Sequence, residues 1–240
     1  MELNFARRSN QPELMDDLTL ASDDLRRNLR ELEVTNRLLG GNGVTLRGIE
    51  ELRCTTYDLR IEKPALEVAD LGCGGGDMLR LMAGAFRKKG ISTALTGIDA
   101  NAFMLGYARE QTAGFPEVSY RQLDVFSNEF SETSFDMVTM TLFCHHFSDE
   151  QLVDLFTVLR RQARLGIVIN DLHRHPLAYY SIWLIAKLLR TSYLYQHDSR
   201  LSVLRAFRRS ELETVLRRAG FTTYQIRWRW AFRWEVVAWC

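Results

Sequence analysis

The chain has 240 residues, which is long enough for one α/β domain with a full hydrophobic core and a modest elaboration. It carries 31 basic and 30 acidic residues, a net charge of +1, and this balance argues against long-range attraction to nucleic acid or to an anionic membrane. Its four cysteines are scattered without a C-x-x-C pair, which argues against a disulfide scaffold or a zinc site and favours a reducing compartment. The N-terminus lacks the apolar core of a signal peptide, and the apolar stretch 176–189 is too short to cross a bilayer. We therefore expect a cytoplasmic protein without stable membrane insertion.

The first part of the chain is predicted to be helical. Ser22 is a suitable N-cap for a helix over residues 23–39, which the pair Gly40-Gly41 ends. A second helix is expected over residues 46–59. Residues 1–62 therefore form a predicted helical N-terminal extension, and residues 63–240 form the main domain.

After Pro64 the pattern alternates between strand and helix. Strands are predicted over residues 65–71, 93–99, 118–124, 135–143 and 164–171, and two antiparallel strands over 221–230 and 234–239 close the chain. Helices are predicted over residues 77–89 and 102–111, and capping boxes at Ser148 with Gln151 and at Ser210 with Glu213 open two more. This alternation predicts an α/β fold with a doubly wound, mostly parallel, seven-stranded sheet, whose ligands bind at the carboxyl ends of the strands.

The turn after the first strand is rich in glycine and reads Asp70-Leu-Gly-Cys-Gly-Gly-Gly-Asp77. A dinucleotide fingerprint, counted from Gly72 and Gly74, would require a third glycine where Asp77 stands. A carboxylate in the first helical turn also competes with a pyrophosphate for the helix N-terminus. S-adenosylmethionine has no phosphate and carries a cationic sulfonium, so the turn favours that cofactor.

The segment VADLGCGGGD resembles the first motif of class I S-adenosylmethionine-dependent methyltransferases, which implies their Rossmann-like fold and their cofactor. By the same resemblance, Asp99 would hold the ribose hydroxyls, and Asp124 would bind the adenine amino group with Val125 against the ring. The alternative is that these aspartates only cap helices or open turns. The cofactor-binding residues that the resemblance implies are Asp70, Gly72, Cys73, Gly74, Asp99, Ala100, Met104, Asp124, Val125 and Thr141.

Histidines follow the fourth and fifth strands, where an acceptor would lie. In related methyltransferases the segment matching LFCHHF passes the methionine end of the cofactor, so His146, then His145, then His173 are the candidate general bases. Because adjacent residues of a strand point in opposite directions, we expect at most one of the first two to face the substrate. Asp171 and His175 are further candidates for orienting a base or substrate, and capping of the next helix is the alternative role. No metal-ligand spacing links these histidines, so no metal is expected.

An aromatic insert over about 176–209 follows the fifth strand and is predicted to roof the active site. Its apolar character fits a small hydrophobic or phenolic substrate, and His175, Tyr179, Trp183 and Tyr195 are the candidate substrate-binding residues. The alternatives are an extra helix packed on the core and a surface that takes a lipid-like substrate from a membrane. The apolar face of the first helix could be part of this lid or the interface of a homodimer.

Arginines are concentrated in the last third of the chain, with few acids between them. The simplest interpretation is that they lie on solvated helix faces and strand edges. The alternative is a site that attracts an anionic substrate or a partner. The residues concerned are Arg200, Arg205, Arg208, Arg209, Arg217, Arg218, Arg227, Arg229 and Arg233.

The segments NQPELMDD, NRLLGG, LFCHHF, INDLHRHPLAYY and LSVLRAFRRSEL together resemble a bacterial methyltransferase subgroup associated with type III polyketide synthases. This resemblance implies O-methylation of a phenol, resorcinol or pyrone in secondary metabolism. The alternatives are C-methylation of a quinone or lipid-like acceptor, methylation of RNA or protein, and a cofactor-binding protein without catalysis. The weak net charge argues against a nucleic-acid partner.

Overall fold

Seven strands form one sheet in the computed structural model, which describes residues 3–55 and 65–240. The order is β3-β2-β1-β4-β5-β7-β6; β1 to β5 are parallel, and β7 lies antiparallel between β5 and β6. The strands are β1 (Leu66–Leu71), β2 (Thr93–Asp99), β3 (Val118–Gln122), β4 (Phe135–Thr141), β5 (Ala163–Leu172), β6 (Thr223–Arg229) and β7 (Arg233–Trp239). The predicted doubly wound sheet and its antiparallel end are confirmed.

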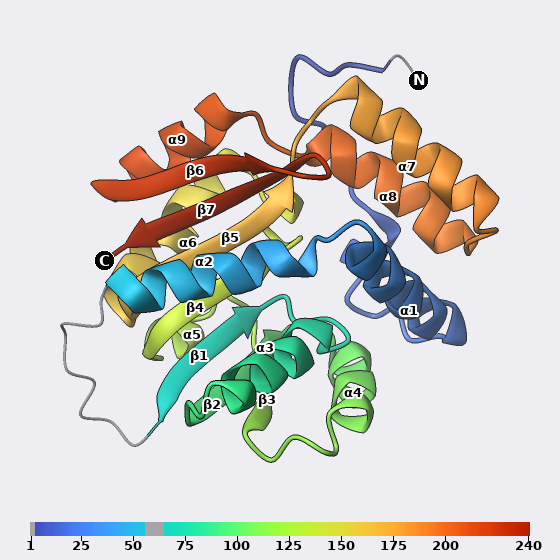
Figure 1. The fold of residues 1–240 in the computed structure, drawn as a ribbon. Helices are drawn as coiled ribbons and strands as arrows, with labels where there is room; N and C mark the ends of the chain where they lie inside the picture. The colour runs from blue at the N-terminus through green and yellow to red at the C-terminus, as the bar shows by residue number, and fades with distance from the viewer. Residues whose placement is uncertain (1–2, 56–64) are drawn as a thin grey trace.

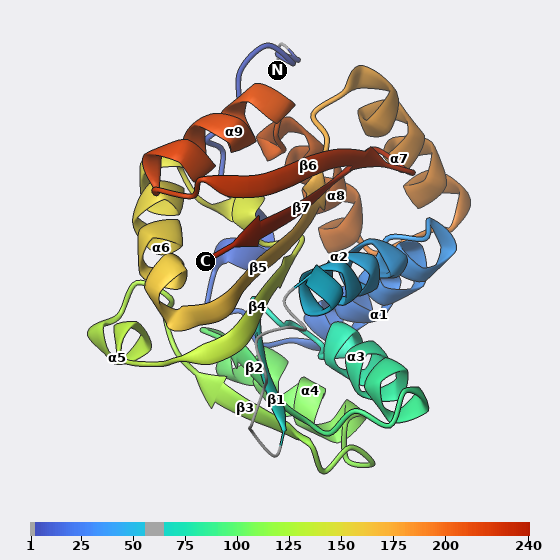
Figure 2. The ribbon, with the colours of Figure 1, turned by 60° about the vertical axis from the view of Figure 1, so that its left-hand side comes forward.

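Helices cover both faces of the sheet (Figure 2). One layer consists of α2 (Asn42–Thr55), α3 (Asp77–Lys88) and α4 (Ala102–Gln111), and the other of α5 (Asn128–Ser131), α6 (Asp149–Gln162) and α9 (Arg209–Arg218). β1 and β4 are buried on both faces, which explains why their sequences are nearly continuous apolar runs. Two hydrophobic clusters, one on each face, hold the layers together.

A third group of helices lies beyond the ends to which the parallel strands point (Figure 1). It consists of α1 (Asp23–Leu38), α7 (Pro176–Leu188) and α8 (Tyr193–Arg205), together with the short helix η1 (Leu14–Asp16). The predicted lid is therefore two helices, and its last residue already belongs to α9. The predicted domain boundary at 62/63 and the end of the helix predicted over 46–59 lie outside the described residues, but α2 itself packs on β5 and β7.

Helix caps decide several of the boundaries. The capping box of Ser148 and Gln151 is confirmed, with both reciprocal hydrogen bonds formed. The predicted box of Ser210 and Glu213 is wrong, because α9 begins earlier, with Arg208 at the N-cap and Glu211 as its partner. Glu213 pairs instead with Arg209 at 2.7 Å on the helix surface. None of the described helices is both long and apolar enough to cross a bilayer.

Candidate active site

The glycine turn after β1 forms one wall of a cavity of about 390 Å³ at the carboxyl ends of the strands. Gly72 has a φ of +65°, and a side chain there would clash with the ring of Phe143, since a Cβ would lie 2.1 Å from it. Seven of the ten predicted cofactor-binding residues line this cavity: Gly72, Gly74, Asp99, Ala100, Met104, Asp124 and Val125. We call it the cofactor-side cavity.

Asp99 lies where the second strand ends and links the glycine turn to α4. One carboxylate oxygen accepts the N–H of Gly74 at 3.0 Å, and the other accepts the N–H of Asn101 at 2.9 Å. Burial raises the pKa of Asp99, and the two backbone donors partly offset this. Asp70 and Asp77 also act electrostatically on this part of the site, and burial raises the pKa of all three carboxyl groups. A cationic ligand bound beside them would favour their ionised forms.

Asp124 opens a turn and also lines the cofactor-side cavity. Its carboxylate accepts the N–H of Phe126 at 2.9 Å and so opens the turn after β3. The same residue lines the cofactor-side cavity next to Val125 and Phe126. Capping a turn therefore does not remove this aspartate from the site.

The structure places three predicted cofactor residues outside the lining of this cavity. Asp70 is buried beneath the turn and accepts the hydroxyl of Thr139 at 2.6 Å; burial raises its pKa to about 7. Cys73 packs in the hydrophobic cluster on the α3 side of the sheet, and burial raises the pKa of its thiol well above the usual value. The Thr141 hydroxyl lies 2.8 Å from that of Thr45 on α2. These three side chains support the turn and the sheet rather than face the cavity.

A second cavity of about 320 Å³ lies between α1, α7, α8 and the turn that joins β6 to β7. Most of its wall is apolar, with Leu32 of α1 and Leu39 just after it, Ile182 and Ile185 from α7, and Phe232 from the turn. We call it the acceptor-side cavity. Met15, Leu142 and His146 line both cavities, so the two meet at these residues.

The histidine pair lies at this junction, but not on a strand. β4 ends at Thr141, Leu142 adopts a left-handed φ of +54°, and Cys144–His146 forms a 3-10 turn. The expectation that at most one imidazole faces the substrate assumed the alternation of a strand, and this premise does not hold for a 3-10 turn. Both His145 and His146 line the acceptor-side cavity, with ring centroids 4.3 Å apart.

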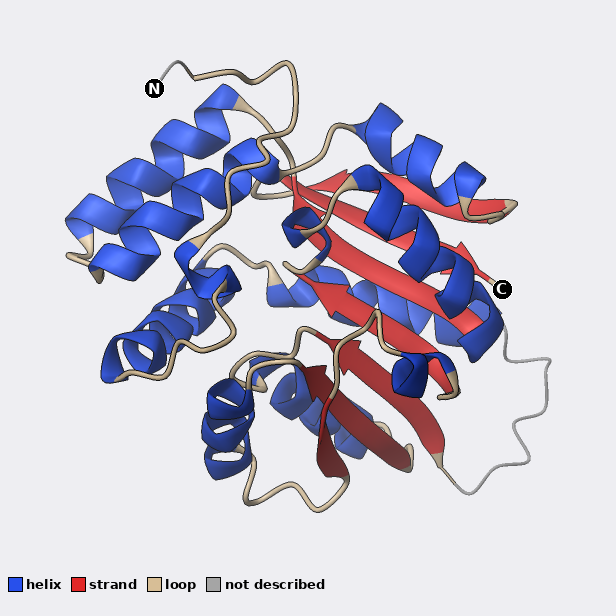
Figure 3. Cartoon of the chain, turned by 180° about the vertical axis from the view of Figure 1, so that it is seen from behind, coloured by secondary structure: helices blue, strands red, loops and turns tan. Residues whose placement is uncertain are grey.

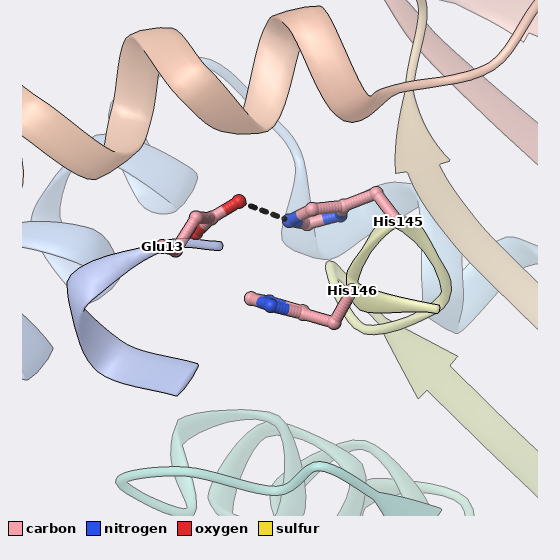
Figure 4. Close-up of side chains that lie close together, drawn as sticks. All are labelled: Glu13, His145 and His146. Carbon is pink, nitrogen blue, oxygen red and sulfur yellow. Dashed lines mark ion pairs between the residues drawn. The ribbon is translucent and has the colours of Figure 1, made fainter. Parts of the chain in front are cut away.

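His145 is held between two carboxylates. Its Nδ1 lies 2.7 Å from Asp171, and its Nε2 lies 3.5 Å from Glu13, as Figure 4 shows for the second contact. Burial would raise the pKa of Asp171, but the contact with His145 outweighs it and lowers that pKa. Burial raises the pKa of Glu13 to about 7, against the opposing charges of His146 and Arg205. Glu13 therefore exchanges a proton near neutral pH.

His146 is oriented by a carboxylate of its own. Its Nδ1 lies 2.6 Å from Asp16, which also accepts Arg205 Nη1 at 2.5 Å. Arg205 further donates to the backbone carbonyl of His146 at 2.6 Å and to that of His145 at 3.1 Å. Burial opposes ionisation of Asp16, but the hydrogen bonds from His146 and Arg205 outweigh it and hold its pKa well below the usual range. With Nδ1 bonded to Asp16, Nε2 of His146 is the nitrogen that can accept a proton.

Four other predicted residues do not line either of these cavities. His173 and His175 lie in a shallow depression with Arg208 and Trp234, where His175 caps α7 by accepting the N–H of Leu177 at 3.1 Å. Tyr179 packs edge-on against Phe5, and Trp183 is partly exposed on α7. α7 turns its other face, with Ala178, Ile182 and Ile185, toward the cavity. Of the predicted substrate residues, Tyr195 lines it, with its hydroxyl 2.8 Å from that of Thr35.

The N-terminal segment supplies site residues to which the sequence assigned no role. It runs past α7 and α8 to η1 (Figure 3), and there Glu13, Met15 and Asp16 reach the cavities. α8 holds it in place, because the carboxylate of Asp198 accepts the N–H groups of Leu14 and Met15 at 2.9 and 3.0 Å. The one signal for this role was the acidic segment NQPELMDD, whose apolar residues show no helical period.

Glu13, His145 and His146 also offer donor atoms that lie within 4.8 Å of one another, the kind of group that can hold a metal ion. His173 and His175 are not part of this group. Each imidazole already has a carboxylate on its Nδ1, an arrangement that supports either metal binding or proton transfer at Nε2.

Comparisons with known proteins show the family and the fold of this chain. A family model described as a methyltransferase domain matches residues 68–166. A Pseudomonas entomophila (strain L48) protein named ubiquinone biosynthesis O-methyltransferase is 30% identical over 139 residues, or 56% of each chain, so this chain spans about half the length of that relative. A Pseudomonas fluorescens (strain Pf0-1) protein of the same name is 30% identical over 190 residues, 75% of each chain. The CMeT domain of the citrinin polyketide synthase superposes with a TM-score of 0.56 at 12% identity, covering 77% of this chain and 49% of that one, and shows the shared fold.

Proposed function

Because the chain belongs to the class I S-adenosylmethionine-dependent methyltransferases, we propose that it methylates an oxygen of a small, apolar phenolic acceptor. The observation that carries this proposal is the junction of the two cavities at Met15, Leu142 and His146. S-adenosylmethionine would lie in the cofactor-side cavity, against the glycine turn, Asp99 and Asp124. The acceptor would lie in the acceptor-side cavity, whose size and apolar walls suit one aromatic ring with a short alkyl chain.

S-adenosylmethionine supplies an electrophilic methyl group whose departure leaves a neutral thioether. The protein has two tasks: to hold the acceptor oxygen in line with that methyl group, and to take up the phenolic proton. Nε2 of His146 accepts the proton, while Asp16 stabilises the imidazolium through Nδ1. Arg205 fixes both Asp16 and the backbone of the histidine turn, so the base is held before the acceptor arrives.

O-methylation is favoured over the alternatives by particular observations. Two relatives that each match more than half of this chain carry names with O-methyltransferase, whereas a citrinin synthase domain named CMeT shares only the fold. A role on RNA would need a cationic face beside the site. Among the arginines of the last third, Arg205 and Arg233 are buried, and Arg209, Arg227 and Arg229 pair with acids. C-methylation of a quinone-like acceptor is the second candidate, because a base near the methyl group serves either reaction.

The test follows labelled methyl from S-adenosylmethionine across a panel of phenols, alkylresorcinols, hydroxypyrones, quinols and bulk RNA. We expect O-methyl products from an alkylresorcinol or pyrone, and His146→Ala should lower turnover by about 10²- to 10⁴-fold with little change in cofactor affinity. His173→Ala is the matched control, since His173 lines neither cavity. Labelled RNA without a labelled small molecule would contradict the proposal, and full activity in His146→Ala would remove His146 from the role of base.

The same assay with EDTA decides how the histidine pair is used. If Glu13, His145 and His146 share protons, turnover after dialysis against the chelator is unchanged. Loss of turnover that returns with a divalent cation would assign the group to a metal instead.

A further inference from the structure

Arg233 is a buried cation on the wall of the acceptor-side cavity. It begins β7, is 3% exposed, and donates to two amide oxygens, Oδ1 of Asn170 at 3.1 Å and Oδ1 of Asn36 at 2.7 Å. Both acceptors are neutral. Among the residues that the structure describes, no acid lies within ion-pair distance of this guanidinium.

The two other buried arginines of the described chain differ in this respect. Arg174 makes a two-pronged pair with Glu211 at 2.6 and 3.0 Å, and Arg205 pairs with Asp16 at 2.5 Å. A buried charge without a counter-charge costs several kcal/mol, so proteins nearly always pair it. Burial lowers the pKa of Arg233 to about 10, against the opposing charge of Asp171, and the group stays charged at neutral pH. The Asp171 carboxylate contacts His145 instead, so Arg233 lacks the contact ion pair that the other two buried arginines have.

The position of Arg233 brings it close to the junction of the cavities. Asn170 holds Arg233 through its side chain and accepts the N–H of Leu142 through its backbone at 2.9 Å, and Leu142 lines both cavities. On the other side of the guanidinium lies Gly41, the residue before α2. A Cβ at this position would lie 2.7 Å from the guanidinium carbon, so a glycine here leaves room for the Arg233 side chain. The guanidinium is therefore fixed on the wall of the acceptor-side cavity, with Asn170 between it and Leu142 at the junction.

We propose that the acceptor carries a carboxylate on its phenolic ring and that Arg233 binds this carboxylate. This inference rests on the proposed function and narrows its substrate class to aromatic hydroxy acids. A guanidinium matches a carboxylate with two parallel hydrogen bonds, which fixes the ring as well as neutralising the charge. The apolar walls contributed by α1 and α7 then take an alkyl substituent of the same ring.

The test compares two probes that differ only in the carboxylate: 2,4-dihydroxy-6-pentylbenzoate and 5-pentylresorcinol. Their dissociation constants are measured by calorimetry at pH 8 on the full chain saturated with S-adenosylhomocysteine. We expect the wild-type protein to bind the acid about 10- to 100-fold more tightly, the range of hydrogen bonds to charged groups. Arg233→Gln should reduce this affinity ratio to about 1. Arg233→Lys should retain part of the ratio, because lysine keeps the positive charge but cannot donate two parallel hydrogen bonds to a carboxylate.

Ile182→Ala is the matched control, because Ile182 lines the same cavity without charge. It should weaken the binding of both probes and leave their ratio unchanged. Equal affinity of the wild-type protein for the two probes, or a preference for the acid that persists in Arg233→Gln, would overturn the inference. The wild-type comparison decides the question even if a variant fails to fold. Methyl transfer to the resorcinol without preference for the acid would leave the proposed function intact. Tight binding of the acid without methylated product would support the Arg233 subsite and contradict the proposed function.

Discussion

Asp99 connects the glycine turn with the start of α4 before any ligand is bound. Its two oxygens accept N–H groups from Gly74 and Asn101, so the carboxylate is already oriented on the wall of the cavity in which we propose that the cofactor binds. A carboxylate that is already oriented loses little conformational entropy when it accepts further hydrogen bonds.

We therefore expect Asp99→Ala to weaken S-adenosylmethionine binding by about 10- to 100-fold, the value of lost hydrogen bonds to a charged acceptor. Asp99→Asn should have a smaller effect, because an amide oxygen still accepts one N–H group. Calorimetric titration with the cofactor measures both, and Asp154→Asn, on the exposed side of α6, is the control. Unchanged affinity in Asp99→Ala would show that the carboxylate serves only the turn.

Glu13, Asp16 and Arg233 show what a sequence pattern does not reveal about single residues. The position of the aspartates at the strand ends is predictable from local sequence, because an apolar strand followed by a glycine turn indicates the edge of the sheet. Glu13 and Asp16 reach the site through contacts with residues 189 positions away, Ser202 and Arg205. Arg233 belongs to a group of nine arginines that look alike in sequence, and only the fold shows that it is buried and bonded to two amide oxygens instead of to a carboxylate of the described chain.

At the level of elements, α8 acts as the support of the N-terminal segment. The carboxylate of Asp198 accepts two consecutive N–H groups, those of Leu14 and Met15, in the way a carboxylate caps the first turn of a helix. Asp198 lines neither cavity, so its substitution would act on the site indirectly, through the position of η1 and through the pKa of Glu13, which the charge of Asp198 helps to raise.

Asp198→Ala should therefore lower kcat by about 10-fold or more, since a displacement of the groups that orient a base by 1 Å is enough for such a loss. Asp198→Asn should restore part of the activity, because its side-chain oxygen still accepts one N–H group. Steady-state kinetics with the acceptor identified above measures the effect, with Asp154→Ala as the control. If Asp198→Ala retains full kcat, η1 does not depend on this support.

The strands and most helices were predictable because periodicity, caps and glycine turns are local. The 3-10 turn at Cys144–His146 was not, since the left-handed Leu142 that produces it is neither glycine nor asparagine. The lid was predicted in place but not in orientation: the large aromatic residues Tyr179 and Trp183 lie away from the cavity, and the smaller apolar residues of α7 line it. Composition indicates that a helix is apolar, but not which side of it meets a ligand.

At the level of the whole molecule, Glu13 links the site to the pH dependence of stability. Its pKa rises from 4.5 to about 7 on folding, so the folded chain binds more protons than the unfolded chain between these values. The stability that this group contributes is complete below about pH 4.5 and is lost as the pH rises through 7. Asp70, whose pKa also rises to about 7, acts in the same direction.

Glu13→Gln should remove part of this slope. We expect the change in the free energy of unfolding between pH 5 and pH 8 to become less negative by about 2–3 kcal/mol, the value of a shift of this size. Urea unfolding at the two pH values measures it, and the exposed Glu150→Gln serves as the control. An identical slope in Glu13→Gln and the wild-type protein would mean that Glu13 stays ionised in the fold.

The attachment of the N-terminal segment to α8 also determines when the site comes into existence. The hydrogen bonds of Leu14 and Met15 to Asp198 close loops of 184 and 183 residues, so they carry the entropic cost of a long closure. During synthesis, the first residues of the chain must wait until α8 has left the ribosome before they can settle beside the histidine pair. The sheet from β1 to β5 can pair earlier, since its strands are complete by Leu172. The contacts that hold Asp16 beside His146 therefore require both ends of this long closure, whereas the cofactor-side turn requires only the strands up to β5.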